Sequence, residues 1–173
     1  MNTLANAVVR LEPQVAAHAN EMFVVLGDPA IYAHENEPPP SAEWLRARFA
    51  RLETRLSADG TQHWLNWVVR LPSGEPIGYV QATVHPSQRA AIAYVLNSRH
   101  WGRGLATAAV ELMVTELVAR YGVLGLSAVL KATNTRSQRL LERMGFARAP
   151  HALHEAFGVE ADEWLMLRDA VLA

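Results

Sequence analysis

A glycine-bearing turn between a strand-like run and a long amphipathic helix constrains this chain most. Residues 99–109 read Arg-His-Trp-Gly-Arg-Gly-Leu-Ala-Thr-Ala-Ala and follow the apolar run 91–96. Apolar side chains then recur with the period of one helix face, at Leu105, Ala108, Ala109, Leu112, Met113 and Leu117. Gly102 and Gly104 carry no Cβ, so the backbone can approach a ligand closely. The first N–H groups of a helix lie unpaired at the positive end of its dipole. Together, these features predict a pyrophosphate site.

Two familiar phosphate-binding patterns fit this turn poorly. A Walker loop needs Gly-Lys-Ser/Thr, and the only lysine, Lys131, lies elsewhere. A dinucleotide fingerprint needs a small third residue where Thr107 stands. It also needs an acid at the end of the next strand, which here ends Val-Leu-Lys at 129–131.

A different pattern matches in full. Residues 99–104 fit Arg/Gln-x-x-Gly-x-Gly/Ala, which resembles the coenzyme A pyrophosphate loop of the GNAT superfamily of N-acetyltransferases. Asn134-x-x-Ser137, followed by a helix ending in Gly145-Phe146, resembles the second signature of that family. The resemblance covers the whole chain and is most specific over 91–146. The Asn-x-x-Ser form, with leucines at 140 and 141, is similar to the branch that acetylates ribosomal-protein N-termini and various small amines.

Composition limits the class of protein. The 173 residues, half of them hydrophobic, predict a single domain over 1–173. The net charge of −1 provides no basic field for nucleic acid. No apolar run reaches the roughly 20 residues of a membrane span, and the N-terminus lacks a basic and apolar leader, so we expect a cytoplasmic protein. The chain has no cysteine, and its histidines lack the spacing of metal ligands, so we expect no metal.

The order of elements predicts an α/β (α+β) fold. A mixed, mostly antiparallel sheet is flanked by helices and contains one splayed parallel pair, 91–96 and 123–130, joined by a right-handed crossover. The remaining expected elements are a strand at 8–11, helices at 15–26 and at 41–56 with Ser41 as N-cap, an antiparallel hairpin at 63–71 and 77–85, a helix at 137–144 stopped by Gly145, and a terminal pair of strands within 151–168.

The resemblance implies acetyl-CoA as cosubstrate. Its pantetheine arm would enter the gap between the splayed strands and pair with the backbone of Tyr94, Val95 and Leu96. An amide at a bulge in that strand would polarise the thioester carbonyl. The pyrophosphate would be surrounded by Arg99, Gly102, Arg103, Gly104, Leu105, Ala106 and Thr107. Asn134 would bond the pantetheine arm. Many relatives place a Tyr in the last helix to protonate the sulfur, but Leu141 stands there, so the resemblance assigns this role to the hydroxyl of Ser137.

The base is the least defined part of the site. Many relatives carry Glu before the central strand's Ile-Gly-Tyr, but this chain reads Ala-Ile-Ala-Tyr at 91–94. Deprotonating a lysine-like amine at pH 7 costs about 4.6 kcal/mol, whereas an α-amine costs only about 1–1.4 kcal/mol. A site without a dedicated carboxylate therefore suits an α-amine. Glu35, in the substrate-side loop, and His85, at a strand end, are the candidates by position.

We therefore expect direct acetyl transfer from acetyl-CoA to a primary amine, on a peptide N-terminus or a small molecule, in a ternary complex. Two alternatives stay open: a CoA-binding sensor or pseudoenzyme, and an acyltransferase for a larger acyl group. Residues 135–138 also match a capping box, so Asn134 and Ser137 could cap a helix as well as bind a ligand. The oligomeric state stays open, with a homodimer among the options.

Overall fold

The computed structural model describes residues 1–34 and 37–169, and these form one eight-stranded mixed sheet. The strands are in the order β1-β2-β3-β4-β5-β6-β8-β7. Every neighbouring pair is antiparallel except β5 and β6, which are parallel. The strand bounds are β1 Leu4–Ala5, β2 Arg10–Pro13, β3 His63–Arg70, β4 Pro76–Val84, β5 Arg89–Leu96, β6 Gly125–Lys131, β7 Ala147–Arg148 and β8 Glu163–Asp169. The predicted fold class is confirmed.

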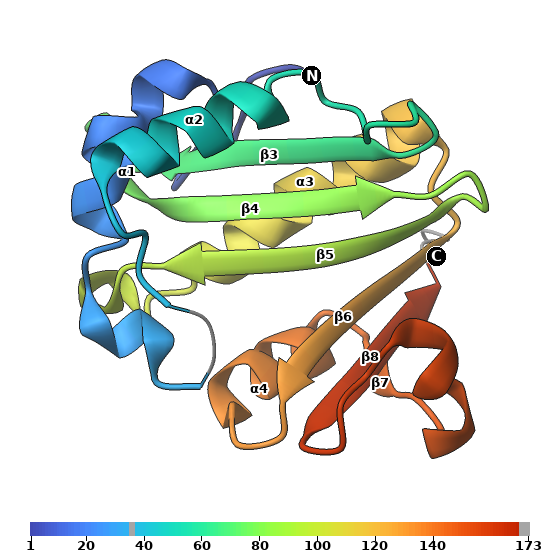
Figure 1. Cartoon of the computed structure of the whole chain (residues 1–173). Helices are drawn as coiled ribbons and strands as arrows, with labels where there is room; N and C mark the ends of the chain where they lie inside the picture. The colour runs from blue at the N-terminus through green and yellow to red at the C-terminus, as the bar shows by residue number, and fades with distance from the viewer. Residues whose placement is uncertain (35–36, 170–173) are drawn as a thin grey trace.

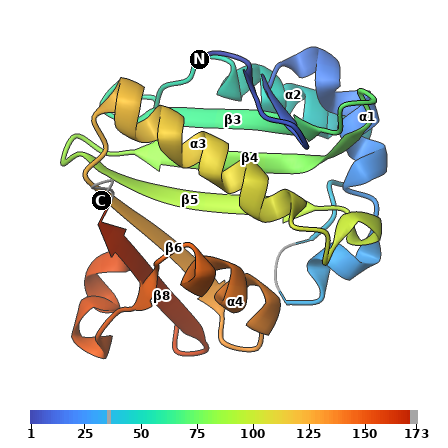
Figure 2. The same ribbon diagram turned by 180° about the vertical axis from the view of Figure 1, so that it is seen from behind.

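Helices cover both faces of the sheet. The α-helices are α1 Ala19–Val25, α2 Ala42–Leu52, α3 Leu105–Tyr121 and α4 Thr135–Arg143. Short 3-10 turns are η1 Ala16–His18, η2 Pro29–Tyr32, η3 Ser98–His100, η4 His151–Leu153 and η5 Glu155–Phe157. α1 and α2 lie on one face of β3 and β4, whereas α3 crosses the other face (Figures 1 and 2).

Successive side chains of β3 point to opposite faces of the sheet, so the buried residues form two layers. Trp67 faces α3 and joins a large cluster with Met113 and Leu117. The next residue, Val68, points to the opposite face and packs in a smaller cluster with Phe49 of α2. A sheet with both faces covered in this way is buried at its centre, and the layers fix the register of each strand.

Local sequence signals account for the ends of the helices. The Ser41 side chain accepts a hydrogen bond from Trp44 N at 3.1 Å and caps α2 as predicted. Gly122, at φ 62°, ends α3 in the left-handed conformation that favours glycine. α2, however, stops at Leu52 rather than continuing to residue 56, and Arg55 lies beyond it at φ 63°.

The C-terminal prediction is partly wrong. The region 151–168 was expected to be two strands, but only β8 lies there, and its partner β7 precedes it at 147–148. Between them the chain forms η4 and η5, with short-range bonds such as His154 N to His151 O at 3.0 Å. Strand β1, which pairs with β2, has no counterpart among the predicted elements.

The parallel pair separates after a short ladder. β5 and β6 pair only at Arg89↔Gly125, Ala90↔Leu126 and Ala91↔Ser127. Beyond these residues the two strands diverge, and the open end of the V faces the loop after α1 and the start of α4 (Figure 1). The predicted splay is therefore present, and it opens between two otherwise continuous halves of the sheet.

Candidate functional site

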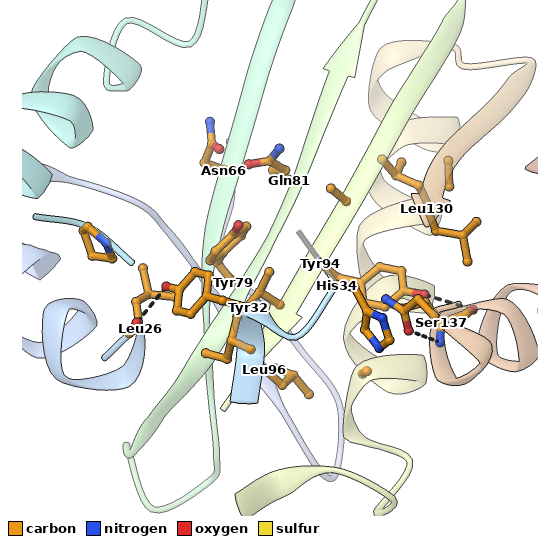
Figure 3. Close-up of a pocket in the computed structure, with 18 of the residues that line it drawn as sticks. Leu26, Tyr32, His34, Asn66, Tyr79, Gln81, Tyr94, Leu96, Leu130 and Ser137 are labelled. Carbon is orange, nitrogen blue, oxygen red and sulfur yellow. Dashed lines mark hydrogen bonds between the residues drawn. The ribbon is translucent and has the colours of Figure 1, made fainter. Parts of the chain in front are cut away.

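A cavity of about 580 Å³ begins where the strands separate. Residues 92–96 of β5 and 128–130 of β6 line it on the two sides of the V. It extends along the sheet to α2 and is lined also by Tyr32, His34 and Glu37, and by residues at the start of α4 that include Ser137 (Figure 3). Among the residues described, no cluster of three or more His, Asp or Glu side chains is arranged to hold a metal, and no helix is long and apolar enough to cross a membrane.

The turn before α3 has the geometry of an anion site. Gly102 and Gly104 have φ values of 72° and 74°, in the left-handed region that L side chains rarely adopt. A Cβ at either position would meet no atom within 4 Å, so their backbone conformation, not crowding, calls for glycine. The first bond of α3 runs from Ala108 N to Gly104 O at 3.1 Å. The preceding N–H groups, those of Leu105, Ala106 and Thr107, lie at the positive end of the 17-residue helix. This arrangement fits a pyrophosphate.

The side chains around this turn tie it to α4. Trp101 Nε1 donates to the carbonyl of Leu96 at 2.8 Å. The guanidinium of Arg136, in the first turn of α4, lies 3.7 Å from the centre of the Trp101 ring. Sequence reasoning missed Arg136, because a cation–π contact between residues 35 positions apart leaves no local pattern.

The two arginines of the predicted loop point to different neighbours. Arg103 Nη1 lies 3.3 Å from His100 Nδ1, beside the turn. Arg99 Nε lies 3.3 Å from Asn97 Oδ1, and Arg99 lines a separate hollow with Glu21 and Glu75. The structure therefore does not bring the Arg99 guanidinium into the main cavity.

The β4–β5 ladder determines which backbone groups of β5 face the gap. Asn97 N donates to Ile77 O at 2.9 Å, and antiparallel pairs alternate along the ladder. The backbone groups of Val95 therefore point toward β4, whereas those of Tyr94 and Leu96 point toward β6. Of the three residues predicted to pair with the pantetheine arm, Tyr94 presents both groups to the gap. The Leu96 carbonyl already accepts from Trp101, and Val95 offers its side chain.

The expected bulge in β5 is wrong. Pairing between β4 and β5 runs without a shift from Gly78↔Leu96 to Val84↔Ala90. The register shift recorded in the β3–β4 ladder lies between Val69 and Arg70. A polarising amide at this site would therefore come from the regular strand edge, where the splay removes the ladder partner.

Polar groups of Asn134, of Ser137 in the first turn of α4 and of Tyr94 in β5 meet where the two strands separate. The Asn134 side chain accepts from Ser137 N at 3.1 Å, so Asn134 caps α4 while lining the cavity. The Tyr94 hydroxyl donates to the Ser137 carbonyl at 3.3 Å (Figure 3). Burial raises the pKa of the Tyr94 hydroxyl to about 12. Sequence reasoning considered only the backbone of Tyr94 and missed this hydroxyl.

The two predicted bases have different outcomes. Glu35 lies outside the described residues. His85 follows β4 at the hairpin end, five residues from Val80, which pairs with Tyr94. At about 3.3 Å per residue this is roughly 16 Å away, so His85 is not brought to the cavity.

His34, the neighbour of Glu35 that the structure describes, lines the cavity. Tyr94 and Ser137 line it too, and His34 Nδ1 is 3.2 Å from Thr133 Oγ1 (Figure 3). The sequence analysis predicted a base in this loop and named Glu35. No sequence pattern distinguished it from its neighbour His34.

Three amide side chains form a row at the inner end of the cavity. Asn66 of β3 pairs with Gln81 of β4, which pairs in turn with Ala93 of β5. Gln14 extends the row, since its N–H donates to Asn66 O at 2.9 Å. The Gln14 side chain is only 3% exposed, and its Nε2 has no hydrogen-bond partner within the described part of the chain. A buried unpaired donor costs about 1–3 kcal/mol, so this group is a candidate ligand contact.

Comparisons with known proteins agree with this geometry. The profile of the family described as "Acetyltransferase (GNAT) domain" matches residues 9–147. A curated relative, L-2,4-diaminobutyric acid acetyltransferase of Streptomyces avermitilis, is 27% identical over 112 residues, covering 58% of this chain. The match spans 61% of that relative's length.

Solved structures share the fold at low identity. The ribosomal L7/L12 α-N-protein acetyltransferase RimL, in complex with coenzyme A, superposes with a TM-score of 0.80 at 14% identity, covering 97% of this chain and 98% of that chain. The ribosomal-protein-S5-alanine acetyltransferase of Vibrio fischeri gives 0.78 at 16% identity, covering 98% and 97%.

Proposed function

Because this chain belongs to the GNAT family of acetyltransferases, we propose that it transfers an acetyl group from acetyl-CoA to a primary amine, directly and in a ternary complex. One observation carries the proposal. The cavity that begins at the gap between β5 and β6 is lined both by polar side chains and by Trp101 and Ala106, on either side of the glycine turn before α3. The curated relative and both ribosomal-protein enzymes are acetyltransferases, which supports an amine as acceptor.

The chain offers groups for each part of the cosubstrate. The N–H groups of residues 105–107 hold the pyrophosphate, and each phosphate charge gains about 0.3–1 kcal/mol from the helix dipole. The Tyr94 backbone pairs with the pantetheine arm, and the Asn134 side chain bonds it further along. Bound in this way, acetyl-CoA supplies an acetyl group as a thioester beside the acceptor cavity.

The CoA thiolate that leaves after acetyl transfer takes up a proton, and a hydroxyl group where β5 and β6 separate can donate it. We assign this role to Ser137, which lines the cavity at the start of α4. The Tyr94 hydroxyl, whose pKa of about 12 keeps it protonated at neutral pH, lies beside Ser137 and stabilises its position.

The acceptor amine must lose a proton before it attacks the thioester, and a residue of the loop after α1 can accept it. An imidazole accepts a proton near neutral pH, and His34 faces the same space as Tyr94 and Ser137. We propose His34 in this role. Its contact with Thr133 fixes the ring against the loop that precedes α4.

A second candidate function is a CoA-binding sensor. The position of the family's tyrosine in the last helix is held by Leu141, a side chain only 1% exposed that belongs to the core. An enzyme for a larger acyl group is a further alternative. Either alternative would bind CoA in the gap between β5 and β6, as the proposed enzyme does. Only measurements of turnover therefore distinguish the three.

The test is thiol release with a panel of amines and N-terminal peptides, using acetyl-CoA and succinyl-CoA in parallel. We expect release with acetyl-CoA on at least one acceptor. Binding of CoA without release on any acceptor would favour the sensor, and faster release from succinyl-CoA would favour the larger acyl group.

A further inference from the structure

The inner end of the cavity is polar on one wall and apolar on the other. The amide row of Gln14, Asn66 and Gln81 forms the wall on the sheet. Opposite it, α2 presents the side chains of Leu45 and Phe49. Such a slot fits a molecule with one hydrogen-bonding edge and one apolar side.

The amide row is neutral and supplies a donor. Asn66 and Gln81 lie side by side at the sheet (Figure 3), and Asn66 Nδ2 is 3.4 Å from the carbonyl of Trp64. The Nε2 of Gln14 is buried and, within the described chain, has no protein acceptor. A buried donor in this state is free to bond an oxygen atom of a ligand.

The arginine, histidine and glutamate residues that line the cavity are all exposed, unlike the buried Gln14 of the amide row. They are His34, Glu37, Arg48 and Arg136, and the Arg136 guanidinium lies over the Trp101 ring. A carboxylate or an ammonium group at the amide row would be a buried ion without a charged partner. A neutral carbonyl oxygen accepts a hydrogen bond there without burying a charge.

Resting on the proposed function, we infer that the acceptor is an amine carrying a neutral carbonyl group, whose oxygen accepts a hydrogen bond from Gln14 Nε2. The amine reacts at the gap beside β5, and the carbonyl lies across β4 and β3. Gln14 is three strand positions from β5, at about 4.8 Å each, so the amine and carbonyl are separated by roughly 10–14 Å.

The unmodified protein provides the first test. Omega-aminoalkanamides of increasing chain length are compared with alkyl amines, diamines and omega-amino acids of equal length, by thiol release and by equilibrium binding to the CoA-loaded protein. We expect the alkanamide of matching length to bind about tenfold more tightly than the alkyl amine. Tighter binding of the diamine or of the amino acid, or no preference, would overturn the inference.

A variant then assigns the preference to one side chain. Gln14→Met keeps the length of the side chain and removes its donor, so this variant should bind the alkanamide and the alkyl amine about equally tightly. Gln138→Met is the matched control, because Gln138 bonds Glu142 on α4 away from the cavity, and it should keep the preference. A preference that survives Gln14→Met would refute the assignment.

The two proposals fail in different ways. An alkanamide preference in binding without thiol release from any amine would contradict the acetyl transfer and leave the recognition intact. Thiol release from alkyl amines and alkanamides with equal KM would contradict the recognition and leave the acetyl transfer intact.

Discussion

A single charge at the N-terminus of α3 tests the anion site. Gly104→Asp and Gly104→Asn differ by one negative charge, and both side chains tolerate the left-handed backbone found there better than most. Neither meets a neighbouring atom at its Cβ, because a Cβ at Gly104 has open space within 4 Å. The comparison between the two variants therefore isolates electrostatics from strain.

The size of the effect follows from Coulomb's law. A carboxylate about 5 Å from each of two phosphate charges is repelled by about 1.7 kcal/mol in a medium with the dielectric constant of water. Salt screening leaves most of this repulsion energy at 10 mM ionic strength and little of it at 1 M. Gly104→Asp should therefore bind CoA about tenfold more weakly than Gly104→Asn at 10 mM ionic strength, and less than about twofold more weakly at 1 M.

Calorimetric titration with CoA at several salt concentrations measures the difference. Thermal unfolding of the ligand-free variants is the control, because an acid at a helix N-terminus stabilises the helix by about 0.3–1 kcal/mol. The Asp variant should thus be at least as stable as the Asn variant while binding CoA more weakly. Equal affinity of two folded variants at low salt would mean that the pyrophosphate lies elsewhere.

Four further outcomes are expected. Ser137→Ala should lower kcat about a hundredfold with unchanged CoA affinity, and unchanged turnover would remove its assignment as acid. His34→Asn should lower kcat/KM about a hundredfold at pH 7, and less above the pKa of the amine; a constant deficit across pH would contradict a base. Tyr94 has a folded pKa near 12, above its unfolded value of 10, so its contribution is present below pH 10 and is lost as pH rises. Tyr94→Phe should therefore lose about 1.3 kcal/mol less stability than the parent between pH 9 and 11 in denaturant titrations, and equal losses would refute the shift. Gly78→Ala should cost about 3 kcal/mol in the same assay, because its Cβ would lie 2.0 Å from the carbonyl oxygen of Val95; a loss under about 1 kcal/mol would show that the strands can separate cheaply.

The sequence predicts the parts of the fold that depend on local chemistry. The helix period after Gly104, the stop at Gly122 and the cap at Ser41 each involve residues within one or two turns, and all three are present. The parallel pair followed from the order strand, helix, strand, which admits few topologies.

The wrong or missing parts depend on distant partners. Residues 151–157 form short 3-10 turns with local hydrogen bonds, so the first of the two expected terminal strands is absent there. The amide row exists only because the ladders align Gln14, Asn66 and Gln81 across three strands. Arg136 over Trp101 joins segments separated by a helix and a strand, and no sequence spacing expresses such a contact.

The three-pair ladder between β5 and β6 also has a mechanical consequence. Strands β1 to β5 form one block and strands β6 to β8 form another. In the described part of the chain, the ladder that joins them is the three pairs of residues 89–91 and 125–127, extended by the bond from Leu124 N to Gln88 O. Amide protons at this junction should exchange with solvent sooner than those in the middle of β3 and β4. A ligand bonded to both blocks would act as a cross-link, and at a hundred times its Kd it would add about 2.7 kcal/mol to the free energy of unfolding. The concentration of cosubstrate would then govern the protein's resistance to proteases as well as its rate of turnover.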